Sequence, residues 1–64
     1  MDPIDINYWL LKNNSSQAKV AKKLKVSRNA VSLVVRGKSE SARIKKTIAK
    51  IIGKKVVEIW PPAA

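Results

Sequence analysis

The 64-residue chain contains neither cysteine nor histidine. Without cysteine, no disulfide can stiffen the fold and no thiolate can bind a metal or attack a substrate. Without histidine, general acid–base chemistry would fall to Asp2, Asp5, Glu40 and Glu58, which are scattered along the chain with no convergent pair. We therefore expect no enzymatic activity, no cofactor and no metal site.

Long apolar runs are also missing. No run approaches the roughly 18 residues that a membrane-spanning helix needs, and the N-terminal stretch carries Asp2 and Asp5 in place of the basic residues of a signal peptide. The 45% apolar content suffices for one compact core. We expect a single cytoplasmic domain over residues 1–64, with a flexible tail at 61–64.

Acidic residues are scarce, and basic residues dominate the charge. Fourteen Lys and Arg oppose four Asp and Glu, for a net charge of +10, and every basic residue lies between Lys12 and Lys55. A chain with this excess of positive charge repels itself unless an anionic partner or counterions screen it. The candidate partners are nucleic acid, an anionic membrane surface and an acidic protein. The alternative is a lysine-rich surface that only keeps the chain soluble.

Capping residues and apolar spacing predict four to five short helices and no strand, an all-α fold. Asp2-Pro3 is a typical helix start, and Asn13-Asn14 should end that first helix. Ile4, Tyr8 and Leu11 recur along it at helical spacing, beside Ile6 and Leu10.

Three further helices follow from the same signals. Ser16 and Ser27 should cap a second and a third helix, the third running through Arg36 before Gly37 stops it. Ser39 should cap a fourth over 40–52, with Glu40 in its first turn. Residues 56–60 can form either a last helical turn or an extended segment, and Pro61-Pro62 prevents continuation.

The second and third helices are short and closely joined, which is the layout of a helix-turn-helix at about 16–37. Six positions carry the apolar residue type that this motif needs, with a small residue where the helices approach and an apolar one in the turn: Val20, Ala21, Leu24, Val26, Val31 and Val34.

The stretch QAKVAKKLKVSRNAVSLVVRG resembles the helix-turn-helix of lambda-repressor-like DNA-binding proteins of the Cro and CI type. The ending GKKVVEIWP is similar to that of Ner-like phage regulators, and together the resemblance covers Ile4 to Pro61. One departure is Lys25, where many members have glycine, because lysine takes a positive φ only at a cost of about 1 kcal/mol. The resemblance implies double-stranded DNA as partner and a backbone contact by Gln17.

With Val31, Val34 and Val35 turned inward, the third helix should present polar residues to the major groove. The candidate base-reading residues are Arg28, Asn29 and Ser32, whose side chains can bond base edges. The candidate backbone-contacting residues are Gln17, Ser27, Arg36, Lys38 and Arg43.

Each of these residues has a simpler alternative. Arg28 can contact phosphate only, Asn29 can be a solvated first-turn residue, and Ser27 can act only as a helix cap. Leu33 can meet a thymine methyl group, be partly buried or contact a partner. The aromatics Tyr8, Trp9 and Trp60 can close the core, contact a second copy or stack on single-stranded bases.

The favoured function is a sequence-specific regulator of transcription, a bacterial or phage repressor associated with the nucleoid when bound, with two copies on neighbouring half-sites. A phage recombination or excision factor would use the same contacts. The alternatives from other classes are a non-specific nucleic-acid binder and a cationic membrane-surface peptide; broken amphipathicity disfavours the latter. An antitoxin-like module would need a longer tail, and no small-molecule ligand is expected.

Overall fold

A computed structural model describes residues 1–61 as five α-helices without a strand. The helices are α1 (Pro3–Lys12), α2 (Gln17–Leu24), α3 (Arg28–Val35), α4 (Ala42–Ile52) and α5 (Val56–Ile59). The predicted all-α fold is confirmed, and the open question at 56–60 is decided in favour of a helical turn. The expected flexible tail at 61–64 lies outside the described residues except for Pro61.

The first three helices begin at the predicted caps. The Asp2 carboxylate accepts the Ile4 N–H at 2.9 Å. Ser16 Oγ accepts the Lys19 N–H at 3.1 Å, and Ser27 Oγ accepts the Ala30 N–H at 3.1 Å. Each bond satisfies one of the backbone donors that a helix start leaves free, which is why these residues define the boundaries.

The predicted start of the fourth helix is wrong by two residues. Ser41, not Ser39, is the N-cap, and its Oγ accepts the Ile44 N–H at 3.5 Å. Glu40 therefore lies outside the helix, where its carboxylate pairs with Lys45 Nζ at 3.1 Å instead of joining the first turn. The third helix also ends one residue early, with Arg36 as its C-cap.

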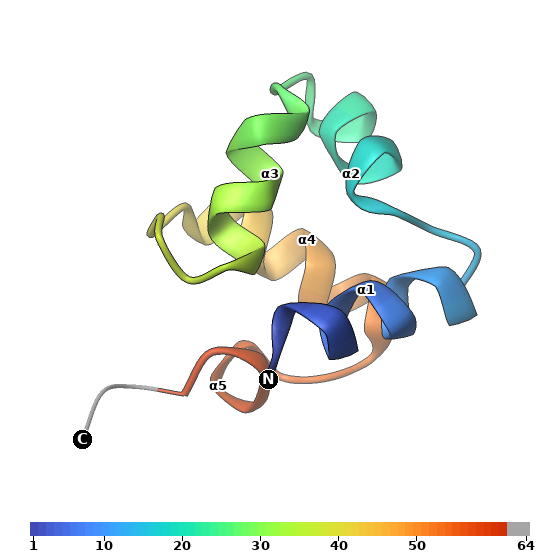
Figure 1. The fold of residues 1–64 in the computed structure, drawn as a ribbon, viewed down its shortest axis with the longest axis vertical. Helices are drawn as coiled ribbons and strands as arrows, with labels where there is room; N and C mark the ends of the chain where they lie inside the picture. The colour runs from blue at the N-terminus through green and yellow to red at the C-terminus, as the bar shows by residue number, and fades with distance from the viewer. Residues whose placement is uncertain (62–64) are drawn as a thin grey trace.

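Figure 1 shows α2 and α3 together at one end of the molecule, α1 and α5 at the other, and α4 between them. α4 contacts every other helix, so it is the central element of the core. Its buried face consists of Ile44, Ile48, Ala49 and Ile52. The rest of the buried core comes from all four neighbours: Ile6, Leu10, Val20, Ala21, Val31, Val34, Val35 and Ile59.

Helix α1 buries a different face from the one that its most regular apolar spacing suggests. Ile6 and Leu10 are fully buried, whereas Ile4, Tyr8 and Leu11 are 76%, 58% and 73% exposed. Tyr8 is therefore not a core aromatic. Ile4, Tyr8 and Leu11 together form an exposed apolar row, called here the α1 stripe.

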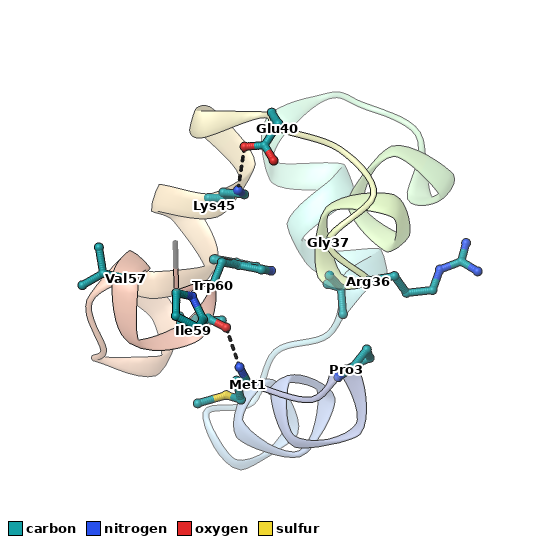
Figure 2. A pocket seen from close by; sticks show the side chains of 11 residues that line it. Met1, Pro3, Arg36, Gly37, Glu40, Lys45, Val57, Ile59 and Trp60 are labelled. Atoms are coloured by element: carbon teal, nitrogen blue, oxygen red, sulfur yellow. Dashed lines mark hydrogen bonds and ion pairs between the residues drawn. The ribbon is translucent and has the colours of Figure 1, made fainter. Parts of the chain in front are cut away.

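The two tryptophans lie partly buried against the core, as the core-packing interpretation expects. Trp60 sits in a hollow of about 590 Å³ between α3 and α5, where Lys45 Nζ lies 5.6 Å from its ring centre. Figure 2 shows this hollow, with the Met1 amino group donating to the Ile59 carbonyl at its edge, at 2.6 Å. That bond ties the start of α1 to α5.

Candidate nucleic-acid interface

Helices α2 and α3 are joined by three residues, Lys25, Val26 and Ser27, and pack on each other more extensively than any other helix pair. Lys25 adopts the left-handed conformation, with φ 57° and ψ 43°. This lets the Val26 N–H reach back to the Ala21 carbonyl at 3.0 Å and close the end of α2. Ala21, only 5% exposed, has the small side chain that close helix packing requires.

One side of α3 is held in the core, and this fixes which residues face outward. Val31, Val34 and Val35 are 0%, 0% and 2% exposed. Because successive residues of a helix are about 100° apart, the opposite side carries the outward row Asn29, Ser32, Leu33 and Arg36. Asn29 and Arg36 are exposed, while Ser32 and Leu33 are half-buried.

Arg28 is exposed but does not share the outward row. It lines a hollow of about 310 Å³ together with residues from α1 and from the start of α2: Asn7, Leu11, Ser15, Ser16, Gln17 and Ala18. Arg28, a predicted base-reading residue, therefore lines the same hollow as Gln17, a predicted backbone-contacting residue.

The N-terminus of α2 adds polarity to this hollow. Gln17 Nε2 donates to Asn7 Oδ1 at 2.7 Å, which holds the glutamine side chain against α1. The backbone N–H groups of Gln17 and Ala18 make no hydrogen bond to any part of residues 1–61. Free N–H groups at a helix start, next to the Arg28 guanidinium, form a positive surface that suits an anion.

The remaining predicted residues surround α3. Ser27 is exposed, and its hydroxyl is engaged as the α3 cap. The Arg36 side chain extends away from the Trp60 hollow in Figure 2, and Lys38 is exposed just after it. Arg43 lies in the first turn of α4, where its guanidinium donates to the Leu24 carbonyl at 3.1 Å, so it also joins α4 to the end of α2.

No carboxylate offsets the positive charge of this surface. The chain has no Asp or Glu between Asp5 and Glu40, a span that includes all of α2 and α3. Glu40 itself is neutralised by Lys45. Basic side chains therefore dominate the charge around α2 and α3, as an interface for a polyanion requires.

Three residues that line this hollow were not identified as site residues from the sequence: Asn7, Leu11 and Ser15. They meet Arg28 only in the folded structure, because each lies at least 13 residues away from it along the chain. Asn7 is the one with a sequence signal, because it is a polar residue inside an otherwise apolar stretch of α1.

Other kinds of site find no support among residues 1–61. No group of three His, Cys, Asp or Glu side chains gathers there into a candidate metal site. None of the five helices in this part of the chain has the length and apolar character needed to cross a bilayer. No protein-family model, curated protein or solved structure matches the chain.

Proposed function

We propose that this protein is a sequence-specific regulator of transcription, a bacterial or phage repressor, that binds double-stranded DNA through α3. The observation that carries the proposal is the two-sided character of α3. Three valines bury one side, and Arg28 and Asn29 are exposed at its N-terminal end. Helices of this kind enter the major groove with their N-terminal residues against the base edges.

Base recognition in this proposal belongs to Arg28, Asn29 and Ser32. A guanidinium can donate two hydrogen bonds to guanine O6 and N7, and an asparagine amide can pair with adenine N6 and N7. The Ser32 hydroxyl can bond either kind of edge. Each well-formed bidentate contact contributes about 1–3 kcal/mol of discrimination against the wrong base pair.

Backbone contacts belong to Gln17, Ser27, Arg36, Lys38 and Arg43. The free N–H groups at the start of α2 give a phosphate a further place to bind beside Gln17. If about five phosphates are neutralised, the logarithm of the binding constant falls with the logarithm of salt concentration at a slope of about −4 to −5. These contacts supply affinity and position the helix without choosing sequence.

The resemblance of residues 17–37 to lambda-repressor-like proteins supports the same function. In that family a glutamine at the start of the second helix touches the DNA backbone and braces the recognition helix. Gln17 lines one hollow with Arg28 and is held by Asn7, which suits that task. Cytoplasmic location, on the nucleoid when bound, is part of the proposal.

The experiment begins with selection of bound duplexes from a random DNA pool. Affinities for the selected duplex and for single-base variants are then measured for wild type, Arg28→Ala and Lys38→Ala. Both side chains are exposed and remote from the core, so both variants should fold. Arg28→Ala should relax preference at one or two base pairs, whereas Lys38→Ala should weaken all duplexes about equally.

The result can also point to a different function. Selection that yields no preferred sequence, with uniform losses in both variants, would identify a non-specific nucleic-acid binder. Tight binding to anionic vesicles, with none to DNA, would identify a membrane-surface peptide.

A further inference from the structure

The α1 stripe is the largest apolar feature that the described surface leaves uncovered. Ile4, Tyr8 and Leu11 stand at i, i+4 and i+7 on one side of α1, and each is more than half exposed. Isolated apolar residues on a surface need no explanation, but a contiguous row on one helix marks an interaction site. The same spacing forms the seam between two packed helices.

The charges along α1 indicate what covers this stripe. Asp5 and Lys12 flank the same edge of the row, near its opposite ends, and both are exposed. When two copies of a helix pack antiparallel, like edges face each other and opposite ends meet. Asp5 of each copy then lies beside Lys12 of the other, and Ile4 of each lies against Leu11 of the other, with Tyr8 near the symmetry axis.

The same charges disfavour other occupants. Asp2 and Asp5 place two carboxylates at the start of α1, in a chain with only four acidic residues and net charge +10, and these disfavour DNA phosphates and anionic lipids at this end of the stripe. Two copies of the chain repel each other over their basic surfaces, and the carboxylates at the start of α1 lower this repulsion where α1 meets α1. We therefore propose that the α1 stripe is a self-association surface, on which a second copy of this chain packs with its α1 antiparallel.

A seam built on three side chains per copy is small. Interfaces that bury less than about 1,200 Å² in total belong to weak, transient encounters. The association is therefore concentration-dependent in free solution. It deepens the proposed function, because a pair of copies presents two α3 helices, but it can be measured without DNA.

The first test is sedimentation equilibrium of the wild type at concentrations up to about 1 mM, where a weak dimer of about −4 kcal/mol becomes half-populated. Ionic strength is set near 0.15 M, where the Debye length is about 8 Å. Salt then screens the long-range repulsion between the two basic chains, but it weakens the ion pairs in direct contact across the seam much less. The mass should rise from that of one 7.1 kDa chain toward that of two. A mass that stays at one chain throughout overturns the proposal.

The second test changes the stripe and compares it with a matched residue elsewhere. Ile4→Ser and Tyr8→Ser should each weaken the dimer by about tenfold or more, since each removes an apolar side chain from the seam. Val57→Ser is the control, because Val57 is likewise apolar and 59% exposed but lies on α5. Equal loss in all three variants contradicts the assignment to α1, provided that thermal melts show each one folded.

The third test exchanges the charges. Asp5→Lys and Lys12→Asp should each weaken association, because each puts like charges together across the seam, and the double variant should restore it. Failure of the double variant to restore association rules out the antiparallel arrangement.

The proposal and the proposed function can fail separately. If the protein stays monomeric but binds a selected DNA sequence, only the self-association proposal is refuted. If it dimerises but binds no DNA, only the proposed regulatory function is refuted.

Discussion

Replacing Lys25 with glycine should stabilise this protein, although lysine is the better helix former. Lys25 has φ 57° and ψ 43°, a left-handed conformation that costs a residue with a Cβ about 1–2 kcal/mol. Glycine removes that cost but adds about 0.5–1 kcal/mol of conformational entropy to the unfolded chain. Lys25 is exposed, and its ammonium group makes no hydrogen bond or ion pair within residues 1–61. The expected net gain is about 0.5–1 kcal/mol.

Lys22→Gly is the matched control for this change. Lys22 is also exposed but lies inside α2, where glycine costs up to about 1 kcal/mol of helix propensity. Both variants have a net charge of +9, one less than the wild-type +10, so electrostatic effects on stability largely cancel between them. The two substitutions should therefore shift stability in opposite directions.

Thermal and urea unfolding followed by circular dichroism measure the difference. In a domain of this size 1 kcal/mol corresponds to about 4–8 °C in Tm. Lys25→Gly should therefore melt several degrees above the wild type and Lys22→Gly several degrees below it. If Lys25→Gly melts as low as Lys22→Gly, the turn is not left-handed at Lys25. The α2–α3 geometry on which the proposed interface depends would then be wrong.

Three further predictions concern the core, a helix cap and the DNA contacts. Ile48→Ala should destabilise the fold by about 2–5 kcal/mol, because Ile48 is fully buried in the central helix, whereas exposed Lys46→Ala should change urea stability by less than about 0.5 kcal/mol. Ser41→Ala should cost about 1 kcal/mol by removing the α4 cap, and Ser39→Ala should have little effect; equal losses in the melts would put the helix start elsewhere. Lys38→Ala should reduce the steepness of the salt dependence of DNA binding by about 1, and an unchanged slope would show that Lys38 touches no phosphate.

The helices that could be predicted are those whose limits are set by local chemistry. A serine or aspartate immediately before a run of helix formers can accept the N–H of the second or third helical residue, so Asp2, Ser16 and Ser27 could be identified from sequence alone. The start of α4 could not, because Ser39 and Ser41 are both competent caps. The choice between them depends on how the chain returns from α3, which local sequence does not show.

The face of α1 that enters the core was ambiguous for a different reason. The helix carries two apolar rows, Ile6 with Leu10 and the α1 stripe, and periodicity alone cannot rank them. The position of α4 decides, because Ile6 and Leu10 are the side chains buried when α1 packs against it. The row that remains outside is the more regular of the two, which is consistent with a second helix as its partner.

The candidate site was predictable as far as the valines of α3 determine it. Their burial places Asn29, Ser32 and Arg36 outward, and no distant contact is needed for that conclusion. The surroundings of Arg28 were not predictable, because they come from the packing of α1 and the start of α2 around it.

Arg28 and Asn29 are neighbours in sequence, but their side chains leave α3 about 100° apart. We therefore expect them to make different contacts with DNA. In the proposed complex Asn29 would face the groove from the outward row, whereas Arg28 would lie beside the free N–H groups of α2, which suit a phosphate. A substitution at Arg28 should therefore change overall affinity and base preference together, while one at Asn29 should change base preference with a smaller loss of overall affinity.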